Sequence, residues 1–384
     1  MKGRQKQSML KLPNPYANIK EKRQLGGFLM KKVLRSVCAA LLAGTAVLSC
    51  SAASASQEEA DSIALPDLND GNWYETMHTD FTRIKNMAQL REAGWAPSPH
   101  GLRNYEYWCD QMISFTNEGL VIRSERQSDH QCEICGVSEG VFTGGIETRE
   151  TNQGKSSMLF AQAFGYFEAT VIVPRGSGMW SAFWLQSDAC GQIGNRGEDG
   201  SEIDVYESSF MRQNPTKTGQ AIHYDAYDAP FYRSKGNVTD VGKNLYDGEA
   251  HTYALKWTPN RYIMYVDGEV VWSTNYGGVS KTPEYLRLTT EIRNNGWGPY
   301  GQKIGQFKNH ADGTNDFVIK EVRVYQNREY EPYIKSPADY QDMKKRYLGA
   351  IIGSSIAGGL VVASALGLAV RAAVKKGKVK KRGK

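Results

Sequence analysis

The run Gly165-Tyr-Phe-Glu-Ala-Thr-Val-Ile-Val173 is rich in aromatic and β-branched residues, which are typical of a β-strand. Runs of the same kind occur at Gly119–Arg123, His251–Trp257 and Tyr262–Val266. The pair Asp267-Gly268 follows the last of these and favours a tight hairpin turn. These segments predict a fold built from antiparallel strands.

Residues 72–327 extend this pattern as many short strand-like runs separated by turn residues. Helical periodicity is scarce, and only Ile84–Glu92 resembles a helix. Strands without alternating helices favour an all-β sandwich over an α/β fold. Residues 56–71 and 328–347 are interpreted as linkers on either side of this domain.

The net charge of +6 is unevenly distributed along the chain. Residues 1–35 contain ten Lys/Arg and one Glu, and residues 371–384 contain eight Lys/Arg and no acid. Without these 18 bases and one acid, the remainder has 29 bases and 40 acids, a net charge of −11. An acidic central domain argues against nucleic acid as a partner.

The N-terminal region has the layout of a secretory signal peptide at residues 30–55. A basic start, Met30-Lys31-Lys32, precedes an interrupted apolar run, and Ala53-Ser54-Ala55 gives a small-residue cleavage pattern. Residues 1–29 fit poorly ahead of such a signal, which suggests an upstream extension and a true start at Met30. Lipidation of Cys50 is left open.

A second candidate membrane segment lies at residues 348–371. Gly349–Val370 contains no charged residue and is long enough to span a bilayer core of roughly 30 Å as a helix. A buried helix is the alternative, but the basic tail at 372–384 favours a transmembrane helix with that tail in the cytoplasm. We therefore expect the central domain at the cell surface, anchored to the membrane.

Four cysteines lie in the central domain: Cys109, Cys132, Cys135 and Cys190. The Cys132-x-x-Cys135 pair resembles half of a zinc site, but no second pair with ligand spacing follows it. One or two disulfides are therefore expected in an exported protein, with the pairing left open.

The segment Glu198-Asp-Gly-Ser-Glu-Ile-Asp-Val-Tyr-Glu207 is the candidate for chemistry. In a strand, Glu202 and Asp204 point to one face, and strict alternation would place Glu207 on the other. A single β-bulge after Asp204 would return Glu207 to the acidic face. Three neighbouring carboxylates acquire different pKa values, which suits an acid and a base. A solvated strand face is the alternative.

Several motifs follow one another along the chain. They are Gly165-Tyr-Phe-Glu-Ala-Thr-Val-Ile-Val-Pro174, Gly178-Met-Trp-Ser-Ala-Phe-Trp-Leu185, the acidic segment, Trp257-Thr-Pro-Asn-Arg-Tyr-Ile-Met-Tyr-Val-Asp-Gly268 and Val322-Arg-Val-Tyr-Gln326. In this order they resemble family 16 of the glycoside hydrolases, the laminarinase and lichenase group. The resemblance covers roughly residues 110–327, and Ser181 stands where the family usually has proline.

This resemblance implies a concanavalin A-like β-jelly-roll sandwich with a catalytic domain at residues 72–327. It implies that Glu202 is the nucleophile and Glu207 the acid/base. Asp204 would hydrogen-bond to the nucleophile and tune it. The longer Glu-x-Asp-x-x-Glu spacing is closer to the laminarinase side of the family.

Aromatic residues near the acidic segment are candidates for substrate binding, because rings pack against the apolar faces of sugars. Trp180 and Trp184 share a strand face, and Trp180 is the better candidate, since core packing is the alternative for one of the two. Trp297 lies in a Gly-rich loop. His223 could form a hydrogen bond to substrate, or its hydrogen bonds could be made to protein groups beneath the cleft. Trp257 and Trp272 are expected in the core.

The expected activity is endo-hydrolysis of β-1,3 or mixed β-1,3/1,4-glucan by a monomer without a cofactor. Alternatives are a galactan hydrolase, a transglycosylase, or an inactive carbohydrate-binding surface protein. Many family members bind a structural calcium ion through an aspartate, and Lys320 occupies the position of that aspartate here. A lysine cannot ligate calcium, so no calcium site is expected unless Glu321 or Asp316 substitutes for the aspartate. Leu286–Arg293 also departs from the usual laminarinase pattern, which leaves the polysaccharide open.

Overall fold

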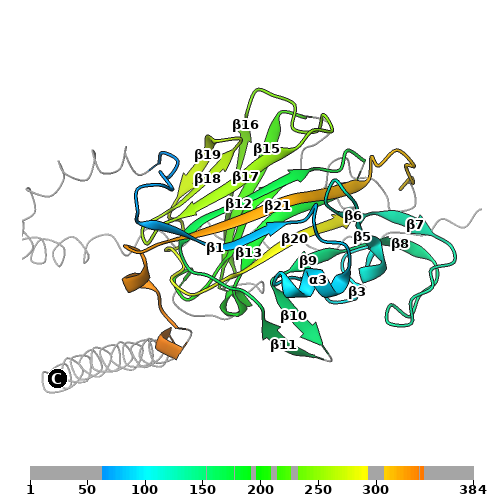
Figure 1. The fold of residues 1–384 in the computed structure, drawn as a ribbon, viewed down its shortest axis with the longest axis horizontal. Helices are drawn as coiled ribbons and strands as arrows, with labels where there is room; N and C mark the ends of the chain where they lie inside the picture. Colours follow the sequence, from blue (N-terminus) through cyan, green and yellow to red (C-terminus); the bar gives the residue numbers. More distant parts are fainter. Residues whose placement is uncertain are drawn as a thin grey trace, which may run out of the picture. The chain divides into compact units, whose positions relative to one another are not determined.

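A computed structural model of the chain describes residues 63–340, except 153, 177, 192–195, 209–213, 226–231, 293–306 and 337. The described residues form a β sandwich of two large antiparallel sheets, with two small sheets beside it (Figure 1). The predicted all-β sandwich is therefore confirmed.

The first large sheet has eight strands. Its order is β19-β18-β17-β12-β21-β6-β5, and β1 also pairs with β21. Strand β21 is long enough to pair with β6 at its start and with β1 at its end. The strands are β1 (Trp73–Asp80), β5 (Ile113–Phe115), β6 (Leu120–Arg123), β12 (Gly165–Ile172), β17 (His251–Trp257), β18 (Tyr262–Val266), β19 (Glu269–Thr274) and β21 (Asp316–Asn327).

The second large sheet has seven strands in the order β16-β15-β14-β13-β20-β9-β2. The acidic strand β14 lies near its middle, between β13 and β15. The strands are β2 (Ala96–Pro97), β9 (Gly145–Glu147), β13 (Met179–Gln186), β14 (Glu202–Glu207), β15 (Lys217–Tyr224), β16 (Arg233–Asp240) and β20 (Tyr285–Ile292).

Smaller elements complete the described structure. A four-stranded sheet has the order β3-β4-β8-β7, and β10 pairs with β11. The α-helix α3 (Met87–Glu92) falls within the segment expected to be helical, and Asn86 caps it. The remaining elements are β3 (Gly101–Leu102), β4 (Tyr107–Trp108), β7 (Glu125–Gln127), β8 (Gly140–Thr143), β10 (Arg149–Asn152), β11 (Lys155–Met158), η1 (Asp110–Met112), η2 (Asp188–Gly191) and η4 (Glu331–Tyr333).

The main core lies between the two large sheets. Phe167 and Val171 of β12 meet Phe183 of β13 and Ile203 of β14 in one buried cluster, and all four are fully buried. Trp257 is also fully buried and Trp272 packs partly against the same core, as expected. Because the inner faces are apolar, the outer face of the second sheet is left for polar side chains and function.

The expected hairpin is present between β18 and β19. Tyr265 and Val266 pair with Val270 and Glu269, and the turn residues Asp267 and Gly268 have φ angles of 48° and 85°. Positive φ at both turn positions is the geometry that favours Asp-Gly.

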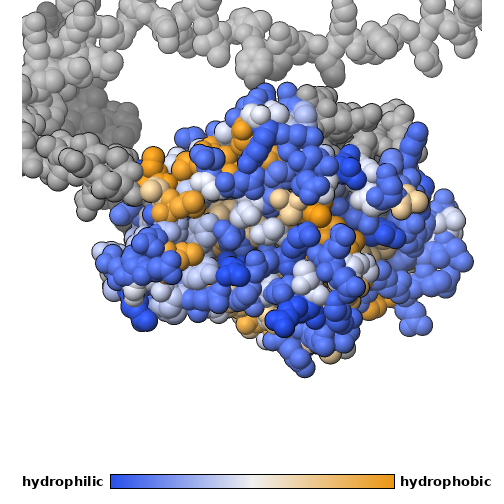
Figure 2. Space-filling model, turned by 45° about the horizontal axis from the view of Figure 1, so that its top comes forward, coloured by the Kyte–Doolittle hydropathy of each residue, from blue (hydrophilic) through white to orange (hydrophobic). Residues whose placement is uncertain are grey.

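The flanking segments contact the domain where the structure describes them. Tyr265 Oη donates to the carbonyls of Ile63 and Ala64, and Tyr330 packs edge-on against Trp73. The face drawn in Figure 2 is mostly hydrophilic, with hydrophobic residues in a few separate groups.

Among the described residues, no helix is both long and apolar enough to cross a bilayer. The signal peptide at 30–55, the transmembrane helix at 348–371 and the tail at 372–384 all lie outside the described residues and stay predictions.

Candidate active site

The acidic strand β14 contains the predicted bulge. Phe183 of β13 pairs with Tyr206, but the next residue, Trp184, pairs with Asp204, so Val205 is the extra residue. The register with β15 shifts at the same place. The bulge is therefore confirmed, and it brings Glu207 to the same face as Glu202 and Asp204.

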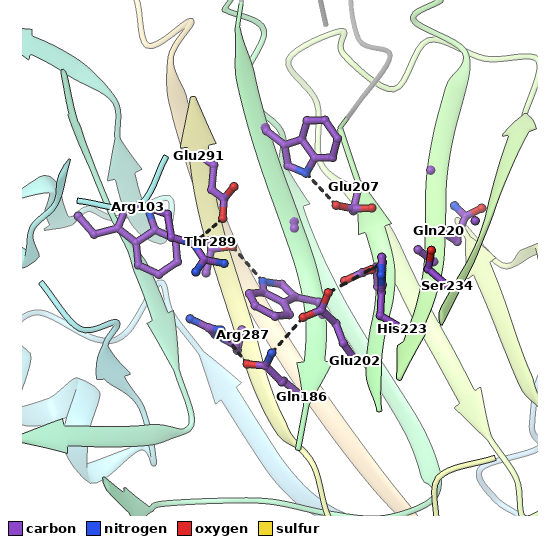
Figure 3. Close-up of a pocket in the computed structure, with 18 of the residues that line it drawn as sticks. Arg103, Gln186, Glu202, Glu207, Gln220, His223, Ser234, Arg287, Thr289 and Glu291 are labelled. Carbon is purple, nitrogen blue, oxygen red and sulfur yellow. Dashed lines mark hydrogen bonds and ion pairs between the residues drawn. The ribbon is translucent and has the colours of Figure 1, made fainter. Parts of the chain in front are cut away.

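These three carboxyl groups line one cleft of about 1080 Å³ on the outer face of the second sheet (Figure 3). The floor comes from β13, β14, β15 and β20, and one wall comes from residues 99–103 and Trp108 around β3 and β4. A cleft of this volume is large enough for several sugar units.

Glu207 is held in a state that favours the protonated carboxyl group. Burial raises its pKa most, and the negative charge of Asp204 raises it further, to about 8. The indole Nε1 of Trp180 donates to Glu207 Oε1 at 2.8 Å and acts in the opposite direction. At neutral pH Glu207 therefore has a proton to donate.

His223 of β15 lies beside the other two carboxylates. Its Nε2 is 3.0 Å from Asp204 Oδ2 and 3.9 Å from Glu202 Oε1, and its Nδ1 contacts the hydroxyl of Tyr232. Burial opposes protonation, but the hydrogen bond and charge of Asp204 and the charge of Glu202 outweigh it and raise the pKa to about 11. His223 is therefore a positively charged imidazolium, and both of its ring nitrogens contact protein side chains.

Glu202 is oriented by a neighbour that the sequence did not reveal. Gln186 Nε2 donates to Glu202 Oε2 at 3.0 Å. The amide oxygen of Gln186 accepts from Tyr285 Oη at 2.7 Å and from Arg287 Nη1 at 3.0 Å. Two donors on its oxygen fix the amide, so that its NH₂ group faces Glu202.

Both candidate tryptophans of β13 line the cleft. Trp180 contacts Glu207, and Trp184 donates through Nε1 to Thr289 Oγ1 at 2.9 Å. The guanidinium of Arg287 lies 4.0 Å from the centroid of the Trp184 ring and covers it. Trp180 therefore remains the better subsite candidate, while Trp297 lies outside the described residues.

Strand β20, on the floor of the cleft, contains a further polar group that sequence reasoning missed. Glu291 of β20 accepts from Arg103 Nε at 2.8 Å and from Asn104 Nδ2 at 2.6 Å. Glu291 lies in the segment 286–293, and the departure of that segment from the family pattern was the only sequence signal for it.

The carboxylates that could replace the family's calcium ligand are already engaged. Asp316 accepts two hydrogen bonds from Arg123, and Glu321 bonds to Arg323 and His78. Each carboxylate is therefore paired with an arginine, and the expected lack of a calcium site stays a prediction.

The cysteines differ from expectation. All four described cysteines are free thiols, so the expected disulfides are not formed among them. Three of them, Cys109, Cys132 and Cys135, gather instead around His100. The other two side chains of the cluster, His100 and Cys109, come from segments upstream of Cys132, so no second Cys pair at ligand spacing marks the cluster in the sequence.

A two-sheet β sandwich with a cleft that contains a protonated carboxyl group beside further carboxylates has the architecture and the groups of a glycoside hydrolase. The model of glycosyl hydrolases family 16 matches residues 100–298, and the chain belongs to this family.

Individual relatives are more distant. An endo-1,3-1,4-β-glycanase of Rhizobium meliloti is 28% identical over 187 residues, which is 47% of this chain and 34% of the relative. The chain spans between 26% and 61% of the length of the curated relatives that it matches.

Two solved structures share the fold. A non-specific endo-β-1,3(4)-glucanase has a TM-score of 0.50 at 24% identity, covering 69% of this chain and 94% of the other. Porphyranase B from Zobellia galactanivorans has a TM-score of 0.52 at 18% identity, covering 66% and 92%. These likenesses concern the fold.

Proposed function

We propose that this protein hydrolyses internal bonds of a β-1,3 or mixed β-1,3/1,4-glucan with retention of anomeric configuration. The observation that supports this most directly is the pair Glu202 and Glu207 on one strand face, with the pKa of Glu207 raised to about 8. Retaining glycosidases need one carboxylic acid and one carboxylate of this kind.

In the first step Glu202 attacks the anomeric carbon while the glycosidic C–O bond breaks. Glu207 gives its proton to the leaving oxygen, so the departing sugar is neutral and the remaining sugar is esterified to Glu202. In the second step Glu207, now a carboxylate, removes a proton from water, and the water oxygen displaces Glu202 from the anomeric carbon. Glu207 is then protonated again.

Asp204 and His223 support this separation of roles. Asp204 raises the pKa of Glu207, and the His223 imidazolium compensates the charge of Asp204 and Glu202. Gln186 holds Glu202 in a fixed orientation. The expected result is one carboxylate ready to attack and one acid ready to donate.

The strand geometry is compatible with retention. Because Val205 is a bulge residue, Glu202 and Glu207 are effectively four strand steps apart, or about 13 Å between Cα atoms. Two glutamate side chains that lean toward a sugar between them can approach the separation of about 5–5.5 Å that retaining enzymes use.

Support for the substrate comes from the endo-1,3-1,4-β-glycanase relative and from charge. An acidic domain suits an uncharged polymer and repels a sulfated one. A galactan hydrolase or a transglycosylase on the same fold remains the alternative.

The test is product analysis of the full-length protein against β-1,3-glucan, mixed-linkage glucan and galactans. We expect glucan cleavage, and Glu207→Gln should reduce kcat about 10²–10⁴-fold because the general acid is lost. Glu202→Gln should lose at least as much. Glu269→Gln, an exposed carboxylate on β19, is the matched control and should retain activity. Cleavage of galactan alone would refute the substrate.

A further inference from the structure

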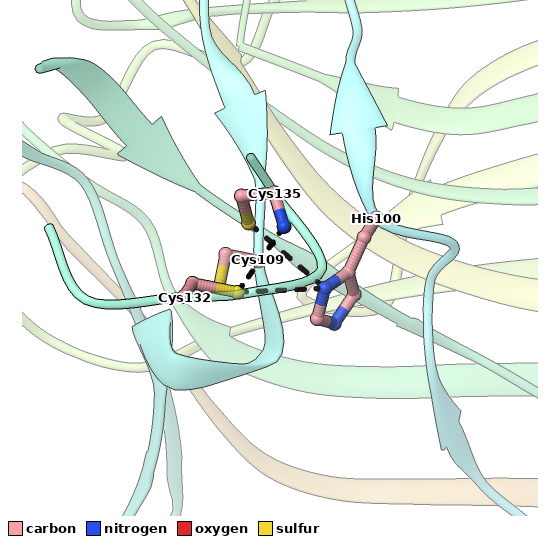
Figure 4. A group of neighbouring side chains, drawn as sticks. All are labelled: His100, Cys109, Cys132 and Cys135. Carbon is pink, nitrogen blue, oxygen red and sulfur yellow. Dashed lines mark hydrogen bonds between the residues drawn. The ribbon is translucent and has the colours of Figure 1, made fainter. Parts of the chain in front are cut away.

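Three thiols and one imidazole converge beside the small four-stranded sheet. The Nδ1 atom of His100 and the sulfur atoms of Cys109, Cys132 and Cys135 all lie within 4.8 Å of one another (Figure 4). His100 directly precedes β3, Cys109 directly follows β4, and the Cys132-x-x-Cys135 pair lies in the connection from β7 to β8. The cluster therefore joins three segments of the chain.

The spacing of these atoms is close to that of tetrahedral coordination. A zinc ion with Zn–S bonds of about 2.3 Å and a Zn–N bond of about 2.0 Å separates its ligand atoms by roughly 3.6–3.8 Å. His100 Nδ1 lies 3.9 Å from both Cys132 Sγ and Cys135 Sγ. A disulfide would need an S–S distance of about 2.05 Å, and three thiols cannot all be paired.

The surroundings suit ligands of a metal ion. His100 Nε2 accepts a hydrogen bond from the backbone N–H of Asp110 at 3.2 Å and lies 3.3 Å from Asp110 Oδ1. A metal ion on Nδ1 would place the ring hydrogen on Nε2, where Asp110 Oδ1 would accept it. A carboxylate behind the ring is the usual support for a metal-bound histidine. The amide N–H of Cys135 donates to Cys132 Sγ at 3.4 Å, which holds the two cysteines of this loop close together.

The segments that hold these four side chains are fixed to the small sheet. Cys109 is buried with Met112 and Phe142, and its amide donates to Thr143 O at 2.9 Å. The loop with the other two cysteines is closed by a hydrogen bond from His130 N to Ser138 O at 2.7 Å, and the His130 ring stacks on Phe142.

We propose that His100, Cys109, Cys132 and Cys135 bind one structural zinc ion. Thiolates with an imidazole in a tetrahedral arrangement select zinc among the common divalent metals. Four protein ligands leave no open position, so the ion is structural and takes no part in the reaction.

The site also has a consequence for the cleft. The segment between His100 and Cys109 includes Arg103, which bonds to Glu291, and Trp108, which donates to Thr290 O at 3.1 Å. Zinc fixes both ends of this segment and therefore holds one wall of the cleft in place.

The experiment is metal analysis of the full-length protein purified without chelators. We expect one zinc ion per chain, and its loss in Cys132→Ser and in Cys135→Ser. Cys190→Ser removes the described cysteine outside the cluster and is the matched control, which should keep the ion. Chelation of zinc should lower the melting temperature of the unmodified protein, and zinc alone should restore it.

A second measurement does not depend on the folding of variants. Co²⁺ exchanged into the unmodified protein should give the absorption of a tetrahedral thiolate site at one equivalent. The proposal is overturned if the protein holds no zinc and takes up no cobalt after reduction. It is equally overturned if Cys132 and Cys135 are found joined as a disulfide, or if the serine variants retain the full zinc content.

Discussion

Burial sets most of the pKa of Glu207, the proposed general acid, and the contact with Trp180 adjusts it. Burial and Asp204 raise the pKa of Glu207, whereas the 2.8 Å hydrogen bond from Trp180 lowers it. The balance gives Glu207 a pKa of about 8. The carboxyl group therefore holds its proton at neutral pH and loses it as the pH rises above about 8.

The first prediction concerns the pH profile. Because Glu207 must be protonated to act, kcat/KM should fall as pH rises through about 8. Trp180→Phe keeps a ring but removes the hydrogen bond that favours the carboxylate, so the basic limb should move to higher pH. A pH profile of both proteins measures this. A basic limb that stays in place, or moves to lower pH, would contradict the role of this contact.

His223 provides the second prediction. Asp204 and Glu202 raise its pKa from 6.5 to about 11 despite burial, so the charged ring stabilises the folded state fully below pH 6.5. This contribution should decline as pH rises from 6.5 through about 11. Urea unfolding of the unmodified protein and of His223→Gln should therefore differ most at low pH. A difference that grows with rising pH would be incompatible with the ion pair.

At the scale of the element, one face of strand β14 packs in the core and the other face provides the proposed catalytic groups. Ile203 and Val205 are fully buried in the core, whereas Glu202, Asp204 and Glu207 line the cleft. The bulge at Val205 lets the strand serve both faces with an extra residue.

The third prediction separates these two faces. Ile203→Ala should lower the free energy of unfolding by about 2–5 kcal/mol, because it leaves a cavity in the core. Its kcat should stay close to that of the unmodified protein when measured well below the melting temperature. Glu202→Gln should show the reverse, with activity lost and stability kept. Loss of activity in a stable Ile203→Ala protein would show that the faces are not independent.

The sequence was informative where the signal is local. Alternation along Glu202–Glu207 placed the carboxylates and required the bulge, and Asp267-Gly268 specified a turn that needs positive φ. The roles of Gln186 and Glu291 could not be predicted from the sequence, because their partners Glu202 and Arg103 are distant in the chain. The cluster around His100 could not be predicted for the same reason, since its members come from three separate segments.

At the scale of the whole molecule, the uneven charge suits an anchored, exported enzyme. The two basic ends flank a chain whose remainder has a net charge of −11. We propose that the domain lies outside the cell and that the basic tail at 372–384 lies inside, because positive residues next to an apolar segment stay in the cytoplasm.

The fourth prediction tests this topology. Protease added to intact cells that express the full chain should remove the β-sandwich domain and spare the tail, with a cytoplasmic protein as the control for cell integrity. A protected domain together with a cleaved tail would reverse the orientation.

The central claim is double displacement through Glu202 and Glu207, and the anomeric form of the first product tests it most directly. Proton NMR should be recorded during cleavage of a β-1,3 or mixed-linkage glucan by the full-length protein, before mutarotation mixes the anomers. A retaining reaction releases the β anomer first, and the α anomer should grow only later as mutarotation proceeds. Release of the α anomer first would contradict the mechanism.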